Sequence, residues 1–294
     1  MNSKKEQKNL KTVWRESANR LRKVGIKTPL LDARVLLQEV LKINYETLLT
    51  SANRVITPEE IEQFDELIGR RLKREPVAKI LGYKEFWSMK FKTTKDTLDP
   101  RPESETLVEA VIRNNKDRKK ELKILDLGTG SGCLILSLLK EFPNAKGLGV
   151  DISIDALRVA AENSEELGLD ERVNFIQSNW LKNVKDRFDI IISNPPYIKT
   201  EAIDFLPAEA RLYDPKIALD GGRDGMKIYR ELLPEIPEKL SLSGKCYFEI
   251  GKWQDHLIED LLKENGYEIT EVINDLAGIP RVIGFQKPYL KVVK

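Results

Sequence analysis

Apolar residues recur at helical spacing through roughly the first 80 residues of this 294-residue chain. One such stretch, "LKTVWRESANRLRKVGI", ends near Gly25, and a second, "PLLDARVLLQEVLKI", opens with Pro29, which suits the first turn of a helix. A third begins at "TPEE", where Thr57 and Glu60 can form a capping box, and we expect it to run to Arg74. These segments predict a small helical domain over residues 1–80 whose apolar faces form its core.

Between residues 81 and 102 the spacing changes from helical to alternating. "YKEFWSMKFKTT" alternates large apolar with polar residues, which is typical of a strand or a β-hairpin. We therefore interpret residues 81–102 as a hairpin that links the helical domain to a second domain over residues 103–294.

The second domain alternates strands with helices. Its expected strands are "LKILDLG", "KGLGVD", "VNFIQ", "FDIIISN", "KCYFEIG", "YEITEVI" and "RVIGFQ". The expected helices between them include Ile154–Leu167, Met226–Leu240 and Trp253–Glu264. This order predicts an α/β fold, a doubly wound sheet of seven strands with helices on its faces.

The composition is that of an ordinary soluble protein. Hydrophobic residues make up 41% and charged residues 33% of the chain, and no apolar run approaches the length of a membrane span. The N-terminus, "MNSKKEQKNLK", lacks the apolar segment of a secretory signal, and the two cysteines, Cys133 and Cys246, have no metal-ligand spacing. We therefore expect a cytoplasmic protein with reduced cysteines, no bound metal and no membrane association.

Charge is divided unevenly along the chain, although the net charge is only +2. Residues 1–120 contain 27 Lys and Arg against 18 Asp and Glu, whereas the remaining residues contain 22 against 29. The basic N-terminal part could meet an acidic partner, such as nucleic acid or a ribonucleoprotein. A solvated helical surface explains it equally well, because no interleaved arginine and aromatic residues accompany the charge.

A glycine-rich turn follows the first expected strand of the second domain. In "ILDLGTGSGCLIL", Gly128, Gly130 and Gly132 carry no Cβ, so a ligand can lie against the backbone where this strand ends. Asp151, nineteen residues after Gly132, falls at the tip of the second strand, where a carboxylate can accept hydrogen bonds from both ribose hydroxyls. The loop and Asp151 together predict a nucleoside site.

The spacing of the glycines distinguishes between classes of nucleoside. A dinucleotide-binding turn reads G-x-G-x-x-G, whereas this chain has G-x-G-x-G preceded by Asp126, which disfavours a dinucleotide-dependent oxidoreductase. The motif "DLGTGSG" resembles the first motif of class I S-adenosylmethionine-dependent methyltransferases. That resemblance implies S-adenosylmethionine as the cofactor, with the loop at its methionine portion and Asp151 at its ribose. An ordinary strand-helix turn would explain one or two glycines, but not three together with Asp151.

The resemblance also implies further cofactor contacts. In the glycine loop they are Gly128, Thr129, Gly130, Ser131 and Gly132. After the third strand, Asn179 stands where this class often has an aspartate, and its amide oxygen can still accept a hydrogen bond from the adenine amino group. Trp180 can cover the purine ring, or it can pack in the core.

The fourth strand, "FDIIIS", ends at the sequence Asn194-Pro195-Pro196-Tyr197. Ligands bind at the carboxyl ends of the strands of a doubly wound sheet, so this motif and the glycine loop should converge. The prolines have no N–H and present only carbonyl acceptors, Asn194 adds a side-chain acceptor, and Tyr197 adds a flat face. Together they predict a pocket that accepts both N–H bonds of a planar amine and aligns its nitrogen for methylation.

Two further stretches narrow the kind of amine. "LDPRPESETLVEAV" precedes the glycine loop, and "LYDPKIALDGGRDGMKIYRELL" follows the Asn-Pro-Pro-Tyr motif. With "DLGTGSG" and "SNPPYI" they resemble the release factor glutamine methyltransferase family, from the region of Lys79 to the C-terminus. The resemblance implies a class I methyltransferase sheet joined by a hairpin to a helical N-terminal domain. It also implies methylation of the glutamine in the Gly-Gly-Gln motif of peptide chain release factors.

The same resemblance implies roles for the motif residues. The substrate-binding residues would be Asn194, Pro195, Pro196, Tyr197, Arg101 and Glu103. Among them Asn194, Pro195 and Tyr197 would be catalytic, and Asn194 would also touch the cofactor. For Glu103, a role at the start of a helix is an equally good explanation.

Release factors are the expected partners, gripped by the helical domain, and we expect a monomer that does not bind nucleic acid directly. Two alternatives keep the same pocket: glutamine methylation of a ribosomal protein, and amine methylation of adenine or guanine in nucleic acid. The nucleic-acid alternative usually needs a target-recognition domain, for which the short helical domain is a modest candidate. A non-catalytic binding module is disfavoured because both halves of the site are intact, the half for the cofactor (the glycine loop and Asp151) and the half for the substrate (the Asn-Pro-Pro-Tyr motif).

Overall fold

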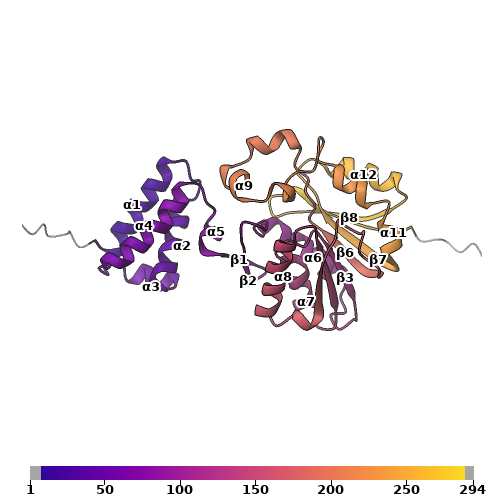
Figure 1. Ribbon diagram of the computed structural model, residues 1–294, viewed down its shortest axis with the longest axis horizontal. Coiled ribbons are helices and arrows are strands. Elements are labelled where there is room, and N and C mark those ends of the chain that lie inside the picture. Colours follow the sequence, from indigo (N-terminus) through magenta and orange to yellow (C-terminus); the bar gives the residue numbers. More distant parts are fainter. Residues whose placement is uncertain (1–7, 289–294) are drawn as a thin grey trace, which may run out of the picture. The chain divides into compact units, whose positions relative to one another are not determined.

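The computed structural model describes residues 8–288, which fall into two compact units. The first unit contains the residues up to Gly82 together with Pro207–Tyr213, and the second contains Tyr83–Leu206 and the residues from Asp214 onward (Figure 1). The chain therefore leaves the second unit at Pro207 and returns to it at Asp214. The hairpin that we expected between the domains belongs to the second unit.

In the described part of the first unit, the regular elements are helices, with one isolated β-bridge between Asn9 and Val55. Its helices are α1 Leu10–Lys23, α2 Pro29–Leu41, α3 Tyr45–Thr50, α4 Pro58–Leu72, α5 Val77–Leu81 and α9 Ala208–Tyr213. Both hydrogen bonds of the predicted capping box between Thr57 and Glu60 are present at the start of α4. This helix ends at Leu72, two residues before the expected Arg74. Buried side chains such as Leu36 and Phe64 form the core of the bundle.

Hydrogen bonds from two arginines, Arg71 and Arg74, to Glu209 attach α9 to the rest of the helical unit. Glu209 accepts hydrogen bonds from Arg71 at 3.0 Å and from Arg74 at 2.8 Å. Arg71 is only 5% exposed and also donates to Asp32 at 2.7 Å. The hydroxyl of Tyr213 donates to the carbonyl of residue 73 at 2.9 Å. These contacts explain why a segment distant in sequence joins this unit.

The second unit is built on a seven-stranded sheet, as predicted. Its strands are β3 Lys123–Leu127, β4 Lys146–Asp151, β5 Val173–Gln177, β6 Phe188–Ser193, β7 Leu240–Glu249, β8 Glu268–Asn274 and β9 Pro280–Gln286. They lie in the order β5-β4-β3-β6-β7-β9-β8; β9 runs antiparallel to both of its neighbours, β7 and β8, and the other pairings of these strands are parallel. The hairpin, β1 Tyr83–Phe86 and β2 Met89–Lys92, is a separate two-stranded sheet.

Helices cover both faces of the sheet. They are α6 Glu105–Asn114, α7 Cys133–Glu141, α8 Ile154–Glu166, α10 Lys227–Leu232, α11 Ile236–Lys239 and α12 Asp255–Glu264, with short 3-10 turns η1 Pro102–Ser104, η2 Asp170–Arg172, η3 Thr200–Phe205 and η4 Lys216–Ala218. Successive residues of β6 face opposite cores: Ile190 and Ile192 pack with α6 and α7, and Ile191 packs with α10 and α12. Within residues 8–288, no helix is both long and apolar enough to cross a bilayer.

One expected helix is wrong. The segment Met226–Leu240 forms two short helices, α10 and α11, and not one long helix. Pro234 and Pro237 explain the break, because a proline lacks the N–H that a continuous helix needs and clashes with the preceding turn.

The order of the strands determines where a ligand can bind. From β3 the chain winds outward through β4 to β5, and it then returns to the other side of β3 at β6. Leu127 and Ser193 are paired across β3 and β6, so the glycine loop and the Asn-Pro-Pro-Tyr motif leave the sheet side by side. This is the reversal point at which open α/β sheets hold their ligands.

Candidate functional site

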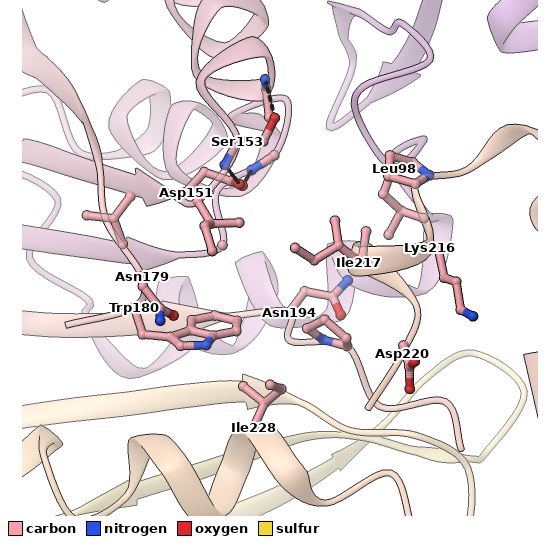
Figure 2. Close-up of a pocket in the computed structure, with 18 of the residues that line it drawn as sticks. Leu98, Asp151, Ser153, Asn179, Trp180, Asn194, Lys216, Ile217, Asp220 and Ile228 are labelled. Carbon is pink, nitrogen blue, oxygen red and sulfur yellow. Dashed lines mark hydrogen bonds between the residues drawn. The ribbon is translucent and has the colours of Figure 1, made fainter. Parts of the chain in front are cut away.

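A cavity of about 750 Å³ lies at the carboxyl ends of these strands. Gly128 and Gly130 line it after β3, Asp151 at the end of β4, Trp180 after β5 and Asn194 after β6. Figure 2 shows Asn194 between Asp151 and Trp180 on one side and a second set of residues on the other. The structure thus brings the two predicted half-sites into one space.

Asp151 is held by the backbone around it. One carboxylate oxygen accepts a hydrogen bond from the Gly130 N–H at 2.9 Å, and the other accepts from the Ser153 N–H at 2.9 Å. Burial raises the pKa of Asp151, and these backbone hydrogen bonds oppose that effect. Each oxygen keeps a second lone-pair direction. A ligand with two adjacent hydroxyls can therefore be bound here.

Trp180 lies against the glycine loop. A Cβ at Gly128 would be 3.3 Å from the Trp180 ring, so a side chain at this position would push the ring away. Trp180 itself has a φ of 54°, a left-handed conformation that non-glycine residues rarely adopt. The half-buried ring packs on the core and also lines the cavity, so both roles considered for it agree with its position. The exposed Asn179 lines the cavity next to it.

The other loop residues shape the loop and do not line the cavity. The Thr129 hydroxyl donates to Asp126 at 2.7 Å, and the Ser131 carbonyl accepts from Asn163 at 2.8 Å. A Cβ at Gly132 would be 3.3 Å from that of Ala160 on α8, so this glycine allows the two helices to pack closely. The cofactor contacts expected of Thr129, Ser131 and Gly132 stay a prediction.

The Asn-Pro-Pro-Tyr motif is divided between the cavity and the interior. Asn194 and Pro196 line the cavity, whereas Pro195 is buried and does not. Tyr197 points inward: its hydroxyl donates to Glu249 at 3.1 Å and its carbonyl accepts from Gln254 at 3.0 Å. The contact of the Tyr197 face with a substrate stays a prediction, since the half-buried side chain donates its phenol hydrogen bond to the buried Glu249 and does not line the cavity.

Arg101 and Glu103 do not line the cavity either. Arg101 forms an ion pair of 2.5 Å with the buried Asp214, which directly precedes a cavity-lining segment at Pro215–Ala218. Glu103 is exposed in the short turn Pro102–Ser104 that precedes α6. Their direct contact with a substrate, expected from the resemblance, stays a prediction.

Sequence reasoning missed the second half of the cavity and the groups behind it. Leu98, Ile217 and Ile228 line the cavity, and so do charged residues, among them Lys216 and Asp220 (Figure 2). All five lie in the two stretches that carry the family resemblance, but no pattern within those stretches singled them out as site residues.

Glu249 was also missed, and here the sequence did contain a sign. It is a carboxylate at the end of the apolar strand segment "KCYFEIG", where ligands bind in such sheets. Burial raises its pKa to about 6. Buried acids of this kind are concentrated at functional sites.

The cavity fits S-adenosylmethionine by the chemistry of its wall. Asp151 can bind ribose hydroxyls, the Gly128 backbone leaves room beside a flat indole, and Asn179 can accept from an amino group. The volume of about 750 Å³ lies within the range of small-molecule sites and leaves space beyond Asn194.

Comparisons with known proteins agree with this geometry. Family models match residues 12–82 as a PrmC N-terminal domain and residues 118–283 as a methyltransferase domain. The release factor glutamine methyltransferase of Caulobacter vibrioides is 39% identical over 277 residues, which cover 94% of this chain and 96% of the relative. That of Rhodospirillum rubrum is 43% identical and covers 90% of this chain and 81% of the relative. The solved hMettl16 catalytic domain, with a TM-score of 0.56 at 13% identity, covers 84% of this chain and 89% of its own, and supports the fold alone.

The predicted fold, family and cofactor are therefore confirmed. Two relatives match most of the chain at about 40% identity, and the methyltransferase model covers most of the residues that line the cavity. The chain belongs to the release factor glutamine methyltransferase family and is an S-adenosylmethionine-dependent methyltransferase.

Proposed function

We propose that this protein methylates the side-chain amide nitrogen of the glutamine in the Gly-Gly-Gln motif of peptide chain release factors. The observation that carries the proposal is the continuity of one cavity from Asp151 and Gly128 to Asn194 and Pro196. A cofactor held at the first pair leaves its reactive end toward the second. Relatives from several bacteria bear the name of this activity.

The chemistry requires the chain to hold a weak nucleophile in one orientation. The lone pair of an amide nitrogen is delocalised, so it attacks only when it is well aligned and its developing positive charge is stabilised. When bound, S-adenosylmethionine supplies an electrophilic methyl group. Asn194 offers a side-chain oxygen to an N–H of the substrate amide, and the adjoining proline backbone is stiff and presents carbonyl acceptors.

The second half of the cavity suits a glutamine carried on a flexible loop. Leu98 and Ile217 give it apolar surface for the methylene groups, and the neighbouring Lys216 and Asp220 are polar groups for main-chain atoms. Glycine residues on either side of a substrate glutamine would let it enter deeply. We assign the helical unit to binding the remainder of the release factor.

Transfer of label tests the proposal. The protein is incubated with methyl-labelled S-adenosylmethionine and, in separate reactions, purified release factor, ribosomes or DNA. We expect label on the release factor, and none on a release factor whose Gly-Gly-Gln glutamine is replaced by alanine. Label on ribosomal protein or on DNA in place of release factor would overturn this assignment in favour of one of the alternatives.

A further inference from the structure

Glu249 is linked by hydrogen bonds to both ends of the Asn-Pro-Pro-Tyr motif, directly to Tyr197 and through Ser104 to Asn194. It is the last residue of β7, and it is only 1% exposed. One carboxylate oxygen accepts a hydrogen bond from Tyr197, at 3.1 Å, and the other accepts from the hydroxyl of Ser104. Ser104 in turn accepts a hydrogen bond from the Asn194 side-chain nitrogen at 3.2 Å. Neither Glu249 nor Ser104 lines the cavity.

The order of donors and acceptors in this chain is determined at its buried end. An ionised carboxylate only accepts hydrogen bonds, so the single O–H of Ser104 must donate its hydrogen bond to Glu249. The lone pairs of Ser104 then require a donor from Asn194, which is the NH₂ end of its amide. The oxygen end of Asn194 is consequently the end available to a ligand in the cavity.

We propose that Glu249 is a positioning residue that sets the orientation of the Asn194 amide through Ser104. This inference rests on the proposed function, in which the Asn194 oxygen accepts from the substrate amide. If Glu249 were protonated, it could donate a hydrogen bond to Ser104. The Ser104 O–H would then be free to donate to the Asn194 oxygen. The asparagine would then present NH₂ groups to the NH₂ of the substrate, and the amide would not be held.

The surroundings of Glu249 come from several elements. The titratable and charged side chains that interact with it are Glu103, Cys133, Tyr197, Tyr229 and Arg281. Burial raises the pKa of Glu249 to about 6, while hydrogen bonds from Ser104 and Tyr197 and the charge of Arg281 oppose that rise. The carboxylate is therefore ionised at neutral pH and takes up a proton as the pH falls through about 6.

The substitution Glu249→Gln tests the inference because it keeps the shape and adds a donor. We expect kcat to fall about 100-fold at neutral pH, the loss typical of a misaligned reacting group, with unchanged affinity for S-adenosylmethionine. In the original protein kcat should decrease below about pH 6, as Glu249 becomes protonated. The variant should lack this decrease, which a purely structural role would not predict.

Three matched variants distinguish the hydrogen-bond relay, which runs from Glu249 through Ser104 to Asn194, from a general effect on packing. Ser104→Ala should lower kcat and remove the same pH dependence, because it breaks the path between Glu249 and Asn194. Tyr197→Phe removes one hydrogen bond to Glu249 but keeps the relay, so its pH dependence should persist. Tyr247→Phe deletes a buried hydroxyl of the same strand that has no hydrogen-bond partner among the described residues, and should behave like the original protein.

The outcomes distinguish the inference from the function on which it rests. Failure of the original protein to label a release factor contradicts the proposed function. If the original protein is active while Glu249→Gln or Ser104→Ala retains its kcat and pH profile, only the positioning role is refuted. Melting temperature and cofactor affinity are measured for every variant. If Glu249→Gln does not fold, the Ser104→Ala result alone decides.

Discussion

Asp151 and Asn194 line the same cavity but offer oxygen atoms to different ligands. Asp151 has a carboxyl group held by two backbone N–H groups, with oxygen lone pairs left to accept from the hydroxyls of a ribose. Asn194 is neutral and is held by one hydroxyl, that of Ser104, which suits an amide that must be released after reaction. Substitution of each should therefore affect a different measurement, cofactor affinity in one case and transfer in the other.

Replacing Asp151 by alanine should weaken binding of S-adenosylmethionine by about 1.5 to 3 kcal/mol, because charge-assisted hydrogen bonds to the ribose are lost. Isothermal titration calorimetry measures this directly. Asp155→Ala provides the control, since Asp155 is an exposed carboxylate in the first turn of α8 that does not line the cavity. Equal affinities for the two variants would refute the ribose assignment.

Replacing Asn194 by alanine should lower kcat by about 100- to 1000-fold, the range seen when one preorganised polar group is removed from a transition state. Affinity for S-adenosylmethionine should change little, because Asp151 and the glycine loop remain. Single-turnover transfer to a release factor gives the rate, and the exposed Asn144→Ala serves as control. Retention of the original rate would exclude Asn194 from the reaction.

At the scale of elements, motifs that are far apart in sequence support one another. Arg101 forms an ion pair with Asp214, and Ser104 donates to Glu249. The backbone of the "DGGRDG" stretch runs beside the Asn-Pro-Pro-Tyr motif, with an isolated parallel bridge between Ile198 and Asp220. The family-specific stretches thus surround the residues of the cavity, even where they do not line it themselves.

Gly221 lies within van der Waals distance of the motif. A Cβ at this position would be 2.7 Å from the Tyr197 Cα and 2.8 Å from the Pro196 carbonyl oxygen, so backbone must move. We expect Gly221→Ala to displace the motif and to lower kcat about 100-fold, as expected for a misplacement of about 1 Å.

The matched control for that substitution is Gly69→Ala in α4, where no atom lies within 4 Å of the added Cβ. This change should leave kcat unaltered and stabilise the helix by about 1 kcal/mol. Turnover and thermal melting of both variants check the pair. Unchanged kcat in Gly221→Ala would show that the close approach does not position the motif.

The sheet was predictable because its strands have an unambiguous pattern. The continuous apolar run Ile190–Ile192 is typical of a strand buried on both faces, and the structure buries it on both. Short helices such as Tyr45–Thr50 and Val77–Leu81 were not predicted, since five or six residues contain too little helical periodicity to detect. The break in Met226–Leu240 could have been predicted from Pro234 and Pro237.

The cavity was only partly predictable, for a related reason. Asp151 ends a strand, and Gly128 and Asn194 directly follow strands, so the strand order alone brings the three together. The inward turn of Tyr197 depends on Glu249, which is 52 residues further along the chain and on another strand. Local pattern contains no information about such a partner, and so the role of the tyrosine could not be deduced from its motif.

At the scale of the whole molecule, the chain contributes a segment of the second half of its sequence to the helical unit. Residues Pro207–Tyr213 belong to that unit, and Arg71 and Arg74 hold Glu209 there. The segment connects, in sequence, the Asn-Pro-Pro-Tyr motif to the cavity-lining Pro215–Ala218. We therefore expect that unfolding of the helical unit would also disorder Pro215–Ala218, because the two segments are joined along the chain.

Replacing Arg71 by methionine should destabilise the protein by about 3 to 5 kcal/mol, because it leaves the carboxylate of Asp32, 6% exposed, without its partner. Denaturant unfolding monitored by circular dichroism measures the loss. Arg15→Met, at an exposed position of α1, should have little effect. Equal stability of the two variants would show that the buried ion pair is not required.

The identity of the atom that receives the methyl group tests the proposed function directly. A release factor is incubated with the protein and S-adenosylmethionine, digested, and analysed by tandem mass spectrometry. We predict one added methyl group on the side-chain amide of the Gly-Gly-Gln glutamine, absent when Asn194→Ala replaces the original protein. A methyl group on any other atom, or equal modification by Asn194→Ala, would contradict the role given to this cavity.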